Sequence, residues 1–473
     1  MRVTVGASVA VVLVAALAMA GVGLLAGPGD VPPLSQAEAL TQARRYGEAL
    51  AVYEHLATRY PHNPQPYLRI GAIRQAQGLP VRAAEAVLLG LARDPQNAAG
   101  LHLLGNIYAD QGERTLAAEK FRASLIADPA QANVRVALGH VLIAQGQLGA
   151  AQAQMAEALG ADPARAEAHY YLALLVAPHD AAAARPHLTA AATDPAFVQR
   201  AADFKCALSQ VETARQAGGD AYALTTLGAG YLQVGEPALA LPVLQHAVRI
   251  APKYADAHAY LGHAWWLLGA LRSALAELDT AIAQDAKFAP AHHWRGLVLH
   301  SQGRYAEARA AFQQALALQP ADAAVCADQA ATYEAQRDYV NAEEWYQKAT
   351  ELAPDDCPLA LRQARFYVEH AIKVRDAGRQ AASRATELLP RDAEAWELLG
   401  WAQYLSEEPS AARRALERSV TLDVDRPSAH YRLGEVLRTM GREEKARCEY
   451  QLAIDLAPEG PWAAKARQAM AGQ

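Results

Sequence analysis

The chain has 473 residues and a net charge of −6, and 52% of its residues are hydrophobic while only 7% are aromatic. A disordered chain would be less apolar, because it buries too little surface to offset the entropy of ordering. Ala and Leu dominate the apolar class, and both are strong helix formers, so the composition predicts a mostly helical protein. The negative charge disfavours DNA or RNA as the main partner, because nucleic-acid binders normally display a cationic surface.

The N-terminal segment is apolar enough to enter a membrane. Residues 3–26 carry no charge, and as a helix they would extend about 36 Å, more than the roughly 30 Å of a hydrocarbon core. The Gly- and Pro-rich linker 28–34 would then end the helix. Two interpretations remain open: a signal anchor over 1–27, and a secretory signal peptide cleaved after Ala20. We expect the anchor, because the apolar stretch exceeds the core of a typical signal peptide.

Charges near this segment predict its orientation. Arg2 and the amino terminus precede it, whereas Asp30 and Glu38 follow it. The positive-inside rule then places the amino terminus in the cytoplasm and the rest of the chain outside it. The opposite orientation remains an alternative.

Prolines and glycines recur with a period of 34 residues over the rest of the chain. The prolines include Pro61, Pro95, Pro129 and Pro163, and two glycine series seven residues apart keep the same period. The first series is Gly71, Gly105, Gly139, Gly228, Gly262, Gly296, Gly400 and Gly434, and the second is Gly78, Gly112, Gly146, Gly235, Gly269, Gly303 and Gly441. Because two residue types hold one period, the pattern indicates a structural repeat.

Each period reads as two helices. Between Asn97 and Pro129, Leu101, Leu104 and Tyr108 fall on one helical face, and Ala117 and Phe121 fall on a second. Gly112 lies between the two faces, at the place of a left-handed helix cap. The sequence therefore predicts a chain of helical hairpins.

This arrangement resembles the tetratricopeptide repeat (TPR). One copy of the family pattern is Leu227-Gly228, Tyr231, Ala240, Leu244, Ala247 and Pro252, and another is Leu433-Gly434, Ala446, Tyr450, Ala453 and Pro458. Eleven repeats run from about residue 64 to 458, after a half-repeat that contains Tyr53 and Leu56. The resemblance implies an all-α fold, a right-handed superhelical TPR solenoid, preceded here by one transmembrane helix.

Departures from the period suggest domain boundaries. Residues 196–219 fit no repeat and read as an extra helix that ends at Gly218-Gly219, and the repeat at 357–390 is 36 residues long. We therefore expect an N-terminal TPR block over 35–219 and a C-terminal block over 220–458. A capping helix over 459–473 would cover the last repeat.

In the TPR family the first helix of each repeat lines a concave groove that binds protein or peptide segments. The resemblance implies that residues near the first glycine series face this groove. The predicted binding residues are Asn106, His140, His263, Trp266, His293, His300, Trp401, Tyr404, Tyr431, Glu435 and Arg438. Trp and Tyr are common in binding hot spots, although packing between repeats is the alternative for each residue. The family's clamp for acidic carboxyl-terminal peptides is not implied, because Asn106 lacks its Lys and Arg companions.

The sequence predicts no catalytic site, no cofactor and no metal. Phosphate-loop, nucleophile-elbow and kinase motifs are absent. The histidines around His263 lack zinc-ligand spacing, so surface or inter-repeat positions are expected. Cys326 and Cys357 are nearly one repeat apart, and free thiols are expected rather than a disulfide.

These features predict a non-enzymatic TPR scaffold anchored in the bacterial inner membrane. Its repeats would lie in the periplasm and bind partner proteins for envelope assembly, secretion, or polysaccharide or pilus biogenesis. The alternatives are secretion into the periplasm after signal cleavage, a cytoplasm-facing adaptor that recruits an enzyme or protease, and the regulatory arm of an enzyme. The last is disfavoured, because the repeats leave no segment for a catalytic domain. The sequence predicts neither the oligomeric state nor the identity of the partner.

Overall fold

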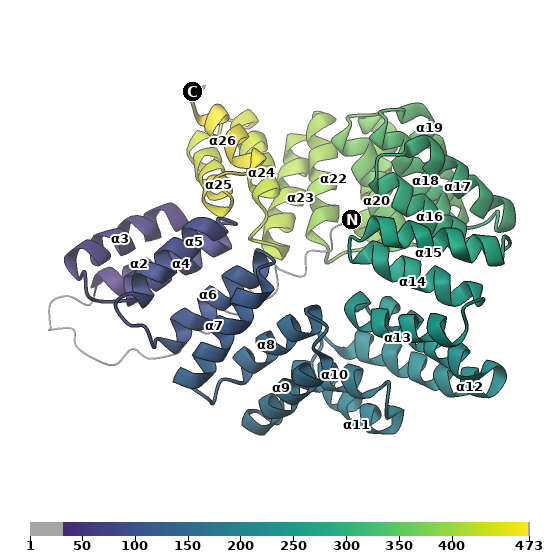
Figure 1. Cartoon of the computed structure of the whole chain (residues 1–473). Coiled ribbons are helices and arrows are strands. Elements are labelled where there is room, and N and C mark those ends of the chain that lie inside the picture. The colour runs from purple at the N-terminus through teal and green to yellow at the C-terminus, as the bar shows by residue number, and fades with distance from the viewer. Residues whose placement is uncertain (1–31, 472–473) are drawn as a thin grey trace. The chain divides into compact units, whose positions relative to one another are not determined.

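The computed structural model describes residues 32–471, which form α-helices and no β-strand in that range. Figure 1 shows antiparallel helices that follow one another along the chain. This confirms the predicted all-helical solenoid of two-helix repeats. The proposed anchor over 1–27 lies outside the described residues, and none of the helices between 32 and 471 is long and apolar enough to cross a bilayer.

The described residues form two compact units. Unit 2 is the continuous segment Ala130–Leu359, and unit 1 joins the residues before it to those after it. The helices of unit 1 are α2 (Pro32–Gln42), α3 (Tyr46–Arg59), α4 (Gln65–Ala76), α5 (Pro80–Leu91), α6 (Ala98–Asp110), α7 (Arg114–Ala127), α20 (Cys357–Glu369, which starts in unit 2), α21 (Arg379–Leu388), α22 (Ala393–Leu405), α23 (Pro409–Leu422), α24 (Pro427–Thr439), α25 (Glu443–Leu456) and α26 (Pro461–Ala471). Those of unit 2 are α8 (Ala132–Ala144), α9 (Leu148–Ala161), α10 (Ala166–Val176), α11 (Ala181–Ala191), α12 (Val198–Gln233), α13 (Pro237–Ile250), α14 (Ala255–Leu267), α15 (Leu271–Gln284), α16 (Ala289–Ser301), α17 (Tyr305–Leu318), α18 (Ala323–Ala335) and α19 (Tyr339–Leu352).

The helices pair as the repeats predict. The hairpin α2–α3 corresponds to the half-repeat, and the pairs from α4–α5 to α24–α25 correspond to the eleven repeats. Helix α12 is interrupted at Gly219, whose φ of 77° and ψ of −168° lie outside the helical region. Its first part is the additional helix of the array. The predicted division into blocks at residues 219 and 220 stays a prediction.

Glycine in the first helix permits the close packing of each hairpin. A Cβ atom on Gly105 would lie 2.5 Å from the Phe121 ring, and one on Gly434 would lie 2.5 Å from the Tyr450 ring. Both rings belong to the second helix of the same hairpin and are fully buried. The first glycine series therefore exists because the two backbones and one large aromatic ring share the space between them.

The second glycine series marks a left-handed turn. Gly112 has a φ of 79°, and the other glycines of the series also have positive φ. Where the series lacks glycine, Arg337 and Glu407 hold the same conformation, with φ of 60° and 66°. The turn geometry thus persists in repeats whose sequence does not announce it.

The long repeat at 357–390 accommodates its additional residues as a π-helical turn. This turn spans Val374–Gly378 and directly precedes α21. Ala371 and Lys373 just before it adopt positive φ. The insertion is therefore absorbed between the two helices of the repeat, a common origin of π-turns.

The first and last repeats contact each other within unit 1. The Arg44 guanidinium pairs with Asp425 at 2.5 Å, and the Gln77 side chain donates a hydrogen bond to the main-chain carbonyl of Asp455 at 2.8 Å. Leu456 is buried in the apolar cluster of α3 beside Tyr46. Both ends of the array in unit 1 are thus covered, since α26 packs on α24 and α25.

Candidate functional site

The predicted binding residues all lie on first helices of hairpins, and we call the side of these helices that carries them the first-helix face. Most of them gather in two groups. One group is on α14 and α16 of unit 2, and the other is on α22 and α24 of unit 1. Asn106 on α6 and His140 on α8 belong to neither group.

In unit 2, His263 lies between two tryptophans. Its ring stacks on Trp294 at a centroid distance of 4.5 Å and on Trp266 at 5.6 Å, with interplanar angles of 14° and 23°. Its Nδ1 is buried without a hydrogen-bond partner. Burial lowers the pKa of His263 to about 4, and the nearby His293 lowers it further. The imidazole is therefore neutral at pH 7 and behaves as part of an aromatic stack.

Polar atoms of this group are satisfied by the next repeat. The Trp266 indole donates a hydrogen bond to Ser301 Oγ at 3.0 Å, and His293 Nε2 lies 2.8 Å from Asp328 Oδ2. His300 Nδ1 lies 3.0 Å from a hydroxyl of α18. These contacts join successive first helices. What this group offers to a ligand is its half-buried ring faces.

In unit 1, Trp401 and Tyr404 stack at a centroid distance of 4.8 Å, and Tyr431 lies beside them on α24. Glu435 is buried, and it accepts hydrogen bonds from the Tyr450 hydroxyl at 2.6 Å and from Arg438 at 2.8 Å. Glu435 thus anchors the hairpin α24–α25. The half-exposed aromatic rings remain the accessible part of this group.

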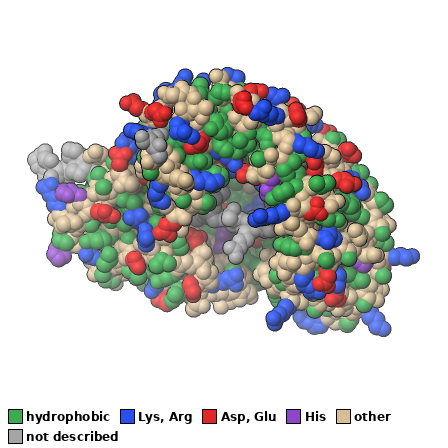
Figure 2. Space-filling view, turned by 90° about the horizontal axis from the view of Figure 1, so that it is seen from above, with side chains coloured by type: hydrophobic (Ala, Val, Ile, Leu, Met, Phe, Trp, Pro, Cys, Tyr) green, Lys and Arg blue, Asp and Glu red, His purple; other side chains and the backbone are tan. Residues whose placement is uncertain are grey.

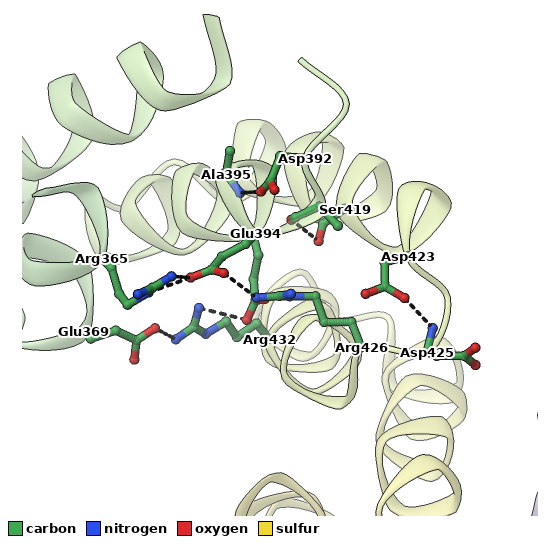
Figure 3. Close-up of polar contacts among 12 residues, drawn as sticks. Arg365, Glu369, Asp392, Glu394, Ala395, Ser419, Asp423, Asp425, Arg426 and Arg432 are labelled. Carbon is green, nitrogen blue, oxygen red and sulfur yellow. Dashed lines mark hydrogen bonds and ion pairs between the residues drawn. The ribbon is translucent and has the colours of Figure 1, made fainter. Parts of the chain in front are cut away.

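A buried charge cluster lies beside these rings, and the sequence analysis missed it (Figure 3). Arg432 and Glu397 are only 3% and 2% exposed, and their side chains pair at 2.9 Å. Arg432 also pairs with Glu369 at 2.5 Å, and its guanidinium lies 5.2 Å from the ring centres of both Trp401 and Trp462. The cluster therefore holds α20, α22, α24 and α26 together.

The rest of the charge cluster extends toward α20. Arg426 pairs with Glu397 and lies 3.5 Å from Glu394, which in turn pairs with Arg365 at 2.6 Å. One signal in the sequence could have located the core of the cluster. Glu397 and Arg432 are 35 residues apart, the same separation as Trp266 and Ser301, which is one repeat plus one residue.

The two isolated residues are packed against their surroundings. Asn106 is only 8% exposed, and its side-chain nitrogen has no hydrogen-bond partner. His140 lies against the Tyr171 ring at 4.3 Å, with Nε2 3.5 Å from a Glu167 oxygen. The structure does not bring either residue together with the two larger groups.

Several other histidines have a local structural role. In His258, His292 and His430, Nε2 lies 3.0 Å from the main-chain carbonyl of the residue six positions earlier. Each ring thereby fastens the loop that precedes its own helix. No cluster of three or more metal-ligating side chains occurs within residues 32–471. The cysteines are free thiols, and burial raises the pKa of Cys326.

Charge on the visible surface is mixed. Figure 2 shows acidic and basic side chains interspersed with hydrophobic ones over the face that it displays. The two aromatic groups therefore stand out by ring content rather than by net charge.

Comparisons with known proteins agree with this architecture. Models of the tetratricopeptide repeat match residues 132–165, 231–295, 289–322, 323–356 and 406–461. No curated protein matches the chain.

Solved structures similar to the chain include the APC/C hetero-tetramer Cut9–Hcn1, with a TM-score of 0.46, 13% identity and coverage of 92% of this chain and 94% of that one. Yeast Tom70 has a TM-score of 0.39 and 15% identity, with coverage of 93% and 95%. The structure reported for Pseudomonas aeruginosa pilF has a TM-score of 0.40 and 23% identity, with coverage of 48% and 99%. The matched repeat models and the observed hairpins together show that this chain is an all-helical solenoid containing tetratricopeptide repeats, a fold of protein–protein interaction scaffolds.

Proposed function

We propose that this chain is a non-enzymatic scaffold that binds a segment of a partner protein on its first-helix face. TPR proteins are generally scaffolds of this kind. The observation that carries the proposal is the presence of half-exposed aromatic rings on successive first helices, above all Trp266 and Trp401. Large rigid rings provide contact area at a small entropic cost, which is why they dominate binding hot spots.

The hydrogen bonds of these rings favour binding over simple packing. The Trp266 indole and the Tyr404 hydroxyl already have partners, at 3.0 Å and 3.2 Å, on the next first helix. A ligand that covers the rings therefore leaves no polar atom of either ring without a partner. Burial of their faces would be favourable, because only apolar surface loses water.

We further propose that the N-terminal segment 1–27 anchors the scaffold in a bacterial inner membrane, with the repeats in the periplasm. The support is the uncharged run of residues 3–26 and the positive charge that precedes it. An envelope role in secretion or in polysaccharide or pilus biogenesis would fit such a location.

Photo-crosslinking in cells tests the binding face. A benzoylphenylalanine residue at position 266 or 404 should capture one discrete partner. The same residue at Val340 or Ile126, which are 79% and 83% exposed on the second helices α19 and α7, should not. Equal capture from all four positions, or capture only from the second helices, would contradict the proposed face.

Topology is tested separately. A reporter fused after Gln473 should be active only outside the cytoplasm, and the mature protein should retain residues 1–27 by mass spectrometry. Cytoplasmic activity would support the adaptor alternative. Loss of the first 20 residues would support secretion into the periplasm.

A further inference from the structure

A cavity of about 780 Å³ opens within unit 2, between the two parts of α12 and the start of α14. It exists because the additional helix that ends at Gly219 does not follow the repeat spacing. A cavity of this volume is within the usual range for ligand sites, roughly 300–1,000 Å³. It can admit a long side chain and the backbone on either side of it.

The lining of this cavity is unusual in its charge. None of the 16 residues that form it is Lys, Arg or His, and its one charged residue is Asp256. Three tyrosines, Tyr222, Tyr254 and Tyr260, stand around this carboxylate, and most of the remaining residues are small, hydroxyl-bearing or amide-bearing. The cavity thus has one negative charge, several ring faces and no positive charge within its walls.

The geometry keeps the carboxylate free of a cation. Asp256 Oδ2 accepts a hydrogen bond from the Tyr254 hydroxyl at 3.4 Å. The Tyr222 and Tyr254 rings meet edge to face at 6.4 Å. Burial, together with the nearby Asp285, raises the pKa of Asp256, but no cationic side chain contributes to that shift. The first turn of α14 favours a negative charge at this position through the helix dipole, so the carboxylate stays ionised at neutral pH.

The cavity is continuous with the binding face proposed above. The Tyr260 ring contacts Trp294 at 5.0 Å, and Trp294 stacks on His263. A segment lying along the first-helix face at α14 and α16 would therefore pass the mouth of the cavity.

We propose that this cavity, the tyrosine pocket, receives a cationic side chain, Arg or Lys, from the partner segment. The carboxylate supplies the opposite charge, and the tyrosine rings supply cation–π contacts. The surrounding hydroxyl and amide groups can accept hydrogen bonds from a guanidinium or ammonium group. The inference rests on the proposed function and deepens it, because it gives the chemistry of one partner residue.

Peptide binding by the full chain tests the pocket. The probes are fluorescein-labelled peptides Gly-Ser-Thr-Xaa-Thr-Ser-Gly in which Xaa is Arg, Lys, norleucine, Gln or Glu, measured by fluorescence anisotropy. The Arg and Lys peptides should bind at least about tenfold more tightly than the norleucine peptide, and the preference should weaken with salt. Asp256→Asn should remove that preference, and Tyr260→Leu should reduce it.

Asp220→Asn is the matched control. It removes the same charge from a side chain that is 75% exposed, pairs with Arg215 and does not line the cavity. It should leave the preference unchanged. Circular dichroism of each variant checks folding.

Two results would overturn the inference: equal binding of the five peptides, including no binding of any, or a preference for Arg and Lys that survives Asp256→Asn. In either case, capture of a partner from position 266 would leave the proposed function intact. Failure of both experiments would reject both.

Discussion

Replacement of Glu397 by Gln should destabilise the repeats around α22 and α24 strongly. Glu397 is 2% exposed and accepts hydrogen bonds from Arg432, which is 3% exposed, and from Arg426. Removal of one member of a buried ion pair typically costs about 3–5 kcal/mol, because the other charge stays buried without compensation. We expect a loss near the lower end of that range, about 3 kcal/mol, since Glu369 still pairs with Arg432.

The measurement is the free energy of unfolding in urea, with hydrogen exchange of peptides from α22 and α24 as a local readout. Glu387→Gln is the control, because Glu387 pairs with Arg384 at 3.2 Å on the surface, where such a pair contributes about 0–1 kcal/mol. The double variant Glu397→Leu with Arg432→Met should regain most of the lost stability, because two buried charges leave together. The reasoning is refuted if Glu397→Gln costs no more than the control, or if the double variant is as unstable as the single one.

Three further predictions concern packing, pH and a buried hydroxyl. Gly105→Ala should cost about 1–3 kcal/mol by overpacking against Phe121, whereas Gly149→Ala, whose Cβ would meet no atom within 4 Å, should be neutral or stabilising; urea titration of both variants decides. Because burial holds the pKa of His263 at about 4 in the folded state, below its unfolded value of about 6.5, its contribution to stability is complete above pH 6.5 and is lost as the pH falls from about 6.5 to 4, by up to about 1.4 kcal/mol per pH unit. The variant His263→Phe should remove that part of the pH slope, and an unchanged slope would reject this origin. Tyr231→Phe should cost about 1–1.5 kcal/mol and speed hydrogen exchange in α10, because the Tyr231 hydroxyl donates to a main-chain carbonyl of that helix at 2.6 Å; normal protection of α10 would contradict it.

The repeats were predictable because each structural requirement left a residue of a distinctive type. A helix that approaches its neighbour as closely as at Gly105 accepts no Cβ atom, and a left-handed turn such as that at Gly112 favours glycine. Both needs recur once per repeat, so the period was readable. The turn at Glu407 was not readable, because a residue with a side chain there adopts the same positive φ.

The candidate site was only partly predictable. Spacing placed the expected residues on first helices, but it did not reveal which polar atoms the next repeat would satisfy. Glu435 was expected to face a ligand, yet Tyr450 and Arg438 occupy its carboxylate. The Arg432–Glu397 pair was missed because charged residues are usually assigned to the surface. Whether the predicted groove residues bind a partner stays a prediction.

The contact between Leu456 and α3 changes how this array should melt. A linear row of repeats loses its terminal members first, because each of them has only one neighbour. In this chain the first and last repeats of unit 1 are each other's neighbours, at a separation of 378 residues between Gln77 and Asp455. Closing so long a loop is slow but adds only modestly to the entropic cost, so this contact should form late in folding and then suppress fraying from both termini.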